Sequence, residues 1–173
     1  EQVRQNRAAI AWIARNAQSF GGDPKRIYVI GHSSGSHVTG MTLVTDWEGV
    51  YGLPPDVVKG AGLASGMYDL EPVRLSSRNG YLKLDAERAA GLSAIRQIPP
   101  AAKIGPLPIV VAYGSGELKE FQRQSRDFAP AWRAAGHPTT VCEIEGNNHF
   151  DMAQDWAQAD RPLFKAMAEI VGL

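Results

Sequence analysis

The 173-residue sequence has a single cysteine, no excess charge of either sign and no long apolar run. One cysteine, Cys142, excludes an internal disulfide framework and any zinc site built from several cysteines, and fits a reducing compartment such as the cytoplasm. The 18 basic residues match the 18 acidic residues, so the charge gives no reason to expect nucleic acid or an acidic membrane as a partner. The apolar stretches, such as Leu107 to Tyr113, fall short of the roughly 18 residues of a membrane helix. We therefore expect a cytoplasmic protein that binds neither nucleic acid nor membrane.

What the sequence does contain is a series of short strand-like and helix-like segments, and its 44% hydrophobic residues suffice for a core. Strands are expected where β-branched and aromatic residues run together, at residues 27–30, 57–64, 107–113 and 139–144. Helical spacing predicts helices over 3–20, 34–44, 85–92, 119–135 and 161–171, with Pro130 kinking or splitting its helix. This alternation predicts one α/β domain over residues 1–173, built on a mostly parallel sheet.

The least regular stretch runs from Asp69 to Pro100. It follows the second expected strand, and its periodicity is helical only near residues 85–92. In α/β folds, ligands bind at the carboxyl ends of the strands. We therefore expect this stretch to be an excursion over that edge of the sheet.

The most informative motif is Gly31-His32-Ser33-Ser34-Gly35, which matches G-x-S-x-G. The match alone arises by chance in a few per cent of chains of this length, given ordinary glycine and serine usage. Its context is more specific, because an expected strand precedes it and an expected helix follows it. In that setting the serine sits on a strained turn that lifts its hydroxyl above the sheet, and the glycines make room for the turn. The motif predicts Ser33 as a nucleophile; the alternative is a glycine-rich turn with solvated serines.

A serine nucleophile needs a base and a carboxylate, which in this fold class follow it in the order acid, then histidine. His149 follows the last expected strand in a polar loop, and Glu117 follows the strand at 107–113 in a tight loop. Both are therefore expected at the edge of the sheet that carries Ser33. Asp69, after the preceding strand, is the alternative acid.

An acyl-transfer site also needs two hydrogen-bond donors for the developing oxyanion. The backbone N–H of Ser34, directly after the nucleophile, is the first expected donor. The second donor usually belongs to a glycine-rich loop after an earlier strand, but only one helix precedes the expected strand at 27–30. We therefore expect the chain to be the carboxyl-terminal part of a longer enzyme, lacking amino-terminal strands that the site needs.

Side chains near these residues are candidates to line the substrate site. They are His32, Tyr68 and Phe150, with Trp47 as a further aromatic candidate. His32 and His37 are five positions apart with no carboxylate or cysteine beside them, so we expect no metal site there. The sequence predicts no cofactor.

Together these residues resemble the α/β-hydrolase fold and, within it, the esterase and kynurenine formamidase (arylformamidase) branch. The resemblance covers most of the chain and rests on residues 31–37, 65–72, 92–93, 120–125 and 148–151. It implies a serine hydrolase whose triad is Ser33, Glu117 and His149. The family usually has aspartate where Glu117 stands, and its His-Gly-Gly loop does not occur in this sequence.

The predicted function is therefore hydrolysis of small-molecule carboxylic esters or amides through an acyl-enzyme intermediate. Within that class, a carboxylesterase and an N-formyl aromatic amidase both remain open. The alternative from another class is a non-catalytic binding protein, or an inactive fragment, that retains the hydrolase fold. The sequence leaves the natural substrate and the oligomeric state open, including a homo-oligomer.

Overall fold

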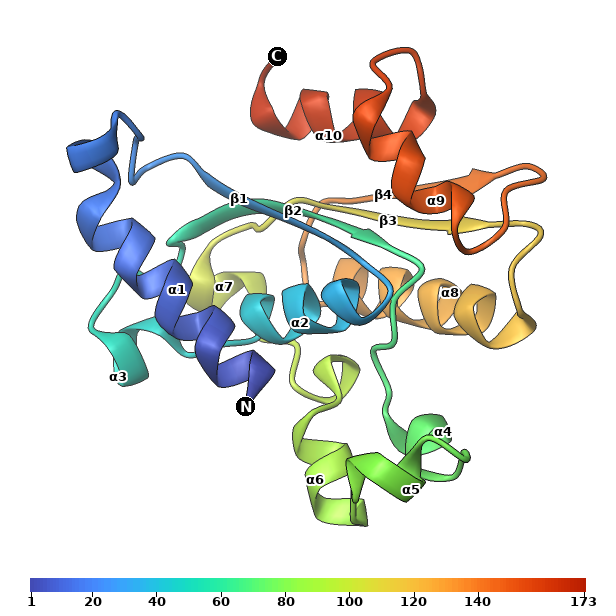
Figure 1. The fold of residues 1–173 in the computed structure, drawn as a ribbon. Helices are drawn as coiled ribbons and strands as arrows, with labels where there is room; N and C mark the ends of the chain where they lie inside the picture. The colour runs from blue at the N-terminus through green and yellow to red at the C-terminus, as the bar shows by residue number, and fades with distance from the viewer.

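The computed structural model describes residues 1–173 and contains one sheet of four parallel strands in the order β1-β2-β3-β4 (Figure 1). The strands are β1 (Ile27–His32), β2 (Val58–Ala64), β3 (Ile109–Gly114) and β4 (Thr139–Ile144). All four predicted strands are confirmed, and their bounds differ from the expected ones by no more than two residues. Because the strands are parallel and adjacent in chain order, their carboxyl ends all lie at one edge of the sheet.

Helices cover both faces of this sheet (Figure 1). On one face lie α2 and α8, with α1 packed beside α2, whereas α9 and α10 lie on the other face. The longer helices are α1 (Gln2–Asn16), α2 (Ser34–Leu43), α8 (Lys119–Ala134) and α10 (Pro162–Val171). The shorter ones are α3 (Trp47–Tyr51), α4 (Glu71–Arg74), α5 (Asn79–Leu82), α6 (Ala86–Gly91), α7 (Ala101–Ile104) and α9 (Asp151–Gln154). None of these helices has the length and apolar character required to cross a membrane.

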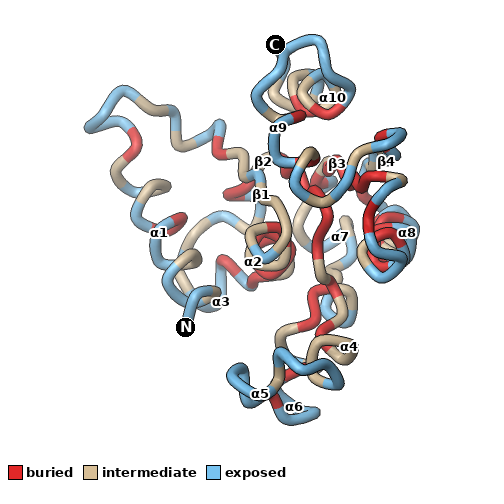
Figure 2. The backbone as a smooth tube through the Cα atoms, turned by 45° about the vertical axis from the view of Figure 1, so that its right-hand side comes forward, coloured by how far each residue is buried: buried red, intermediate tan, exposed pale blue.

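The apolar core lies on both sides of the two central strands, and every residue of β3 is buried (Figure 2). A strand that is buried on both faces is a continuous apolar run, which is why the sequence of β3 lacks alternation. The larger cluster, on the side of α2 and α8, includes Trp47, Phe128 and Trp132. Trp47 is only 2% exposed, so the prediction that it lines a substrate site is wrong.

Within residues 69–100, α4, α5 and α6 form a projection, whereas Ala94, Ile95 and Ile98 pack into the main core (Figure 1). The projection starts at the carboxyl end of β2, as expected, but extends away from the sheet on the side of α2 and α8. Its own small apolar cluster, formed by Leu70, Leu84 and Ala89, holds it together, while α5 and α6 are mostly exposed (Figure 2). The projection therefore flanks the carboxyl edge and does not cover it.

Helix α8 contains Pro130 and remains a single α-helix, so the prediction that the proline splits it is wrong. Proline removes one backbone donor and leaves the carbonyl oxygen four residues earlier, that of Arg126, without a helical partner. Both Pro130 and Arg126 are exposed. Water can therefore satisfy that carbonyl oxygen, and the helix continues.

His37 on α2 ties this helix to the projection, because its Nε2 lies 2.9 Å from the carbonyl oxygen of Leu92. Burial lowers the pKa of His37 below its ordinary value of 6.5. The unfolded chain therefore binds a proton at a higher pH than the folded chain does. Full stability is expected above about pH 6.5, and the free energy of unfolding should fall as the pH drops further, by at most about 1.4 kcal/mol per pH unit for this histidine.

Chemical denaturation between pH 7 and pH 5 checks this expectation. The matched variant is His37→Gln, which retains a side-chain N–H for the Leu92 carbonyl but cannot titrate. The free energy of unfolding of the variant should depend less steeply on pH than that of the wild type. If the free energy of unfolding depended equally on pH in the two proteins, the pH dependence could not be assigned to His37.

Candidate active site

The turn between β1 and α2 holds Ser33 in a strained backbone conformation, with φ 57° and ψ −119°. Ser33 is the N-cap residue of α2, but its side chain does not bond to the helix, so its hydroxyl is available for another partner. Gly31 makes the turn possible, because a Cβ there would collide with the backbone of Gly35. A Cβ at Gly35 would meet open space. The expectation that both glycines make room for the turn is therefore confirmed for Gly31 and wrong for Gly35.

The residues that follow β1, β2 and β3 extend the parallel hydrogen-bond pattern beyond the strands. The backbone N–H groups of Ser33, Ser65 and Ser115 each donate to a carbonyl oxygen near the end of the adjacent strand, at 3.0, 2.8 and 3.0 Å. These three serines therefore stand in a row along the carboxyl edge of the sheet. His149 comes from the loop after β4, at the same edge.

The side chains of Ser33, His149 and Glu117 form a continuous hydrogen-bonded chain. His149 Nε2 lies 2.9 Å from Ser33 Oγ, and His149 Nδ1 lies 2.6 Å from Glu117 Oε1. The carboxylate can only accept from the imidazole, so Nδ1 carries the proton and Nε2 is left to accept from the Ser33 hydroxyl. The Glu117 side chain is fully buried and that of His149 is 22% exposed.

The loops that carry Glu117 and His149 are joined to each other directly. Gly116 N–H donates to the carbonyl oxygen of Asn147 at 3.0 Å, and Gly146 N–H donates to Ser115 Oγ at 2.8 Å. The backbone of Asn147 lies so close to Gly114 that a Cβ at Gly114 would collide with it. The sheet therefore brings the two loops together, and these contacts bring the imidazole to the carboxylate.

The second oxygen of the Glu117 carboxylate is also satisfied. Its Oε2 accepts from Ser65 Oγ and from the backbone N–H of Gly114, both at 2.9 Å. Gln122 Nε2 donates to the Glu117 backbone carbonyl at 2.8 Å and so holds the loop. A buried carboxylate needs such donors to remain favourable. The sequence analysis did not identify Ser65 and Gln122 as residues that hold Glu117. Ser65 could have been found from its position directly after a buried strand, which it shares with Ser33.

Known proteins similar to this chain include esterases and a formamidase. The family model of the carboxylesterase family matches residues 5–67. Kynurenine formamidase from Salmo salar is 30% identical over 98% of this chain and 56% of its own length. Isoprenylcysteine alpha-carbonyl methylesterase from Arabidopsis thaliana is 24% identical over 88% of this chain and 40% of its own length.

Solved structures are similar over most of the chain. Esterase 2 from Thermogutta terrifontis superposes with a TM-score of 0.66 at 21% identity, covering 98% of this chain and 61% of the esterase. A carboxylesterase from Lactobacillus plantarum gives a TM-score of 0.67 at 19% identity, covering 85% of this chain and 54% of the other. The chain has the α/β-hydrolase fold. It spans about half the length of the curated relatives that it matches.

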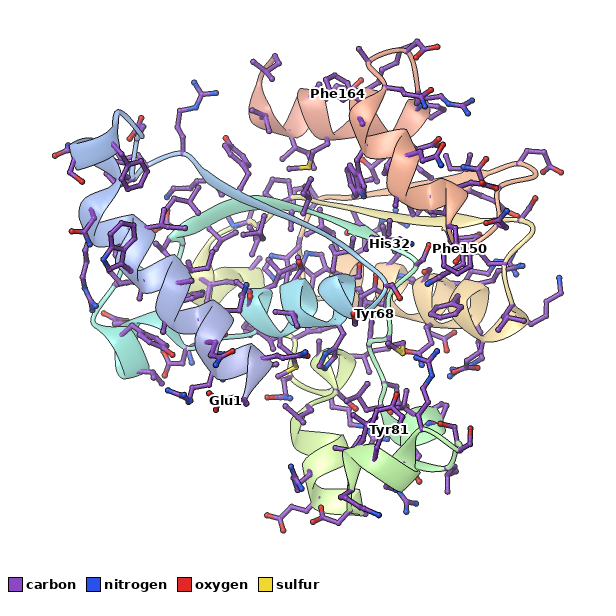
Figure 3. The ribbon with its side chains drawn as sticks, in the orientation of Figure 1. Glu1, His32, Tyr68, Tyr81, Phe150 and Phe164 are labelled. Carbon is purple, nitrogen blue, oxygen red and sulfur yellow. The ribbon has the colours of Figure 1, made fainter.

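Aromatic rings surround the imidazole of His149. The ring of Phe121 stacks on it with centroids 4.3 Å apart, His32 lies at 4.7 Å, and Phe150 meets it edge-on at 5.8 Å. His32 Nε2 also lies 2.7 Å from the His149 carbonyl oxygen, to which it donates, and burial lowers the pKa of His32. Phe150, labelled near His32 in Figure 3, is an exposed side chain, and 79% of its surface is accessible. His32 and Phe150 thus lie beside His149, and their role in lining a substrate site stays a prediction.

Two predicted residues lie elsewhere in the structure. Tyr68, which Figure 3 labels, is completely buried. It stacks on Phe128 with centroids 4.2 Å apart and has its hydroxyl 3.4 Å from Ser36 Oγ. Burial raises its pKa. The prediction that Tyr68 lines the substrate site is therefore wrong, because its ring fills the core between α2 and α8.

Asp69, the alternative acid, is engaged within the projection. Its Oδ1 accepts from Ser93 Oγ at 3.3 Å, from Arg96 Nη2 at 3.4 Å and from the backbone N–H of Glu71 at 3.1 Å. These bonds fix the start of α4. His149 Nδ1 is bonded to Glu117 instead, so the alternative that Asp69 orients the histidine is wrong for this structure.

The expected oxyanion donor, the backbone N–H of Ser34, belongs to the first residue of α2. The first N–H groups of a helix lack partners within the helix and favour negative charge. No acceptor is hydrogen-bonded to the Ser34 N–H in the structure. The group is therefore available to a negatively charged oxygen formed at Ser33.

Proposed function

We propose that this chain carries the catalytic serine, acid and histidine of a hydrolase that cleaves small-molecule carboxylic esters or amides. The observation that supports the proposal best is the continuous hydrogen-bonded chain from Ser33 Oγ through His149 to Glu117. A binding protein has no chemical need for a serine held in this way, because a hydroxyl gains nucleophilicity only from an aligned base.

The proposed reaction has two halves. His149 Nε2 takes the proton from Ser33 Oγ as that oxygen attacks the substrate carbonyl, and the resulting imidazolium gives the proton to the departing alcohol or amine. Water then enters, gives a proton to the same Nε2 and attacks the acyl-enzyme, and the proton returns to Ser33 as the acid leaves. Glu117 keeps Nδ1 protonated and stabilises the imidazolium, while the Ser34 N–H binds the oxyanion.

The names of the relatives support both ester and amide substrates, because they include a formamidase and a methylesterase. We keep the broader class, and the choice between carboxylesterase and arylformamidase activity remains a prediction to be tested on matched substrates. A cytoplasmic location likewise remains a prediction that rests on the single cysteine.

Labelling with a fluorophosphonate tests the proposal on the natural full-length protein. This reagent phosphonylates activated serines, and one similar solved structure is an esterase phosphonylated by sarin. We expect one adduct, located on Ser33 by mass spectrometry of the digested protein. The adduct should form at least 100-fold more slowly in His149→Ala, since an aligned base contributes on the order of 10² to 10⁴ to such steps.

The controls separate the site from the fold. Ser77 is exposed and its hydroxyl makes no hydrogen bond, so Ser77→Ala should label like the wild type. A folded protein that does not label at all, or labels at a serine other than Ser33, would overturn the proposal. In the first case a binding protein with the hydrolase fold becomes the better description.

A further inference from the structure

A cavity of about 220 Å³ lies between the projection and the start of α8. Its wall is mostly apolar and comes from two segments far apart in the sequence. The apolar residues are Met67, Pro72, Val73, Leu118 and Phe121. An engineered apolar cavity of about 150 Å³ accepts benzene, so this one has room for a ring or a short aliphatic chain.

The cavity adjoins the proposed catalytic residues through one shared side chain. Phe121 lines the cavity, and its ring also stacks on the imidazole of His149 with centroids 4.3 Å apart. Leu118, another lining residue, directly follows Glu117 and is 74% exposed. A substrate whose carbonyl lies at Ser33 could therefore extend past Phe121 into the cavity.

Arg78 gives the cavity a positive charge that no protein group neutralises. The chain has 12 arginines, and in 11 of them the guanidinium donates a hydrogen bond or forms an ion pair within the protein. The exception is Arg78, which lines the cavity. A guanidinium with all its donors free is suited to bind a carboxylate with two parallel hydrogen bonds.

The one acidic residue of the cavity wall is already engaged. Glu120 accepts two hydrogen bonds from Arg123, at 2.9 and 2.6 Å, and one from Gln124 at 3.0 Å. The bonds from Arg123 lower the pKa of Glu120, so it stays ionised and paired. Among the residues that line the cavity, Arg78 is therefore the charged group without a partner in the protein.

We propose that this cavity holds an apolar arm of the substrate and that Arg78 binds a carboxylate at the end of that arm. The inference rests on the proposed function, since it names the class of ester or amide that the site would take. It predicts a preference for anionic substrates over neutral ones of the same shape. Because Arg78 is exposed, the preference should weaken as salt is added.

A binding measurement tests the inference without relying on catalysis. In the Ser33→Ala form of the full-length protein, 4-phenylbutanoate should bind about tenfold more tightly than the neutral 4-phenylbutanamide, as followed by titration calorimetry or NMR. Arg78→Gln should remove that difference, and Arg78→Lys should retain part of it. The matched control is Arg133→Gln, which removes the same charge at the far end of α8, where Arg133 contacts the Thr139 carbonyl.

Hydrolysis of matched probes gives the second readout. One pair varies the acyl side, 4-nitrophenyl hydrogen adipate against 4-nitrophenyl hexanoate, and another varies the leaving group, 4-acetoxybenzoate against 4-acetoxybenzamide. For one of the two pairs, the anionic-to-neutral ratio of kcat/KM should fall about tenfold in Arg78→Gln and stay unchanged in Arg133→Gln. The pair that responds tells which side of the scissile bond occupies the cavity.

The outcomes separate the two proposals. Preferential binding of the anion without hydrolysis of any probe would support the cavity assignment and count against the hydrolase. Hydrolysis with an anionic-to-neutral ratio that Arg78→Gln does not change, together with equal binding of the two phenylbutanoyl ligands, would overturn the cavity assignment alone. A ratio that falls equally in Arg133→Gln would overturn it too, because net charge would then explain the effect.

Discussion

Replacing Ser33 with alanine should lower kcat for ester hydrolysis by about 10⁴- to 10⁶-fold in the natural full-length protein. The hydroxyl is the atom that would form the acyl-enzyme, and no neighbouring side chain stands on the strained turn in its place. Alanine keeps the Cβ of serine, so the φ of 57° costs the folded chain about the same in both proteins. The loss should therefore appear in the rate and not in the stability.

Steady-state kinetics together with thermal unfolding checks this expectation. The wild type, Ser33→Ala and the surface control Ser77→Ala should unfold at similar temperatures, and only Ser33→Ala should lose activity. A loss of less than tenfold in a folded Ser33→Ala protein would show that another group attacks the substrate. The rate that remains should come from binding and from the oxyanion donor, which are unaffected by the change.

The parts of the fold that follow from local patterns could be predicted from the sequence. The continuous apolar run at residues 107–113 corresponds to a strand buried on both faces, and the glycine motif at 31–35 corresponds to the turn that lifts Ser33. Glu117 and His149 could be proposed as partners of Ser33 because each follows a later strand. Parallel strands bring their carboxyl ends to one edge of the sheet. The distances of 2.9 and 2.6 Å depend in addition on contacts between loops, which the sequence does not display.

Other features depend on tertiary packing and could not be predicted. Tyr68 follows a strand just as Ser33 does, yet its ring turns into the core because Phe128 on α8 offers a stacking surface there. Pro130 is tolerated because that side of α8 faces water. The cavity beside Arg78 is lined by two segments about 40 positions apart, and one of them shows no clear periodicity. Such features depend on which segments meet, and that is decided only in the folded chain.

Replacing Glu117 with glutamine should lower kcat by about 10⁴-fold, because the amide would favour the wrong tautomer of His149. Ser65 Oγ and the Gly114 N–H both donate to Oε2, so the acceptor oxygen of the amide must take that position. The amide NH₂ then faces His149 Nδ1, which can only accept from it. The proton of the imidazole moves to Nε2, and Nε2 can no longer accept from the Ser33 hydroxyl.

The matched control for this change is Asp69→Asn, since Asp69 is the other carboxylate that follows a strand at this edge. Its contacts are with Ser93, Arg96 and the backbone of Glu71, and none of them reaches His149. Its kcat should therefore remain within about threefold of the wild type, as for most changes outside a catalytic unit. A larger loss of kcat in Asp69→Asn than in Glu117→Gln would assign the orienting carboxylate to Asp69. We expect the larger loss of kcat in Glu117→Gln. The rate then depends on the Glu117 carboxylate, whose Oε2 is held by Ser65 and Gly114.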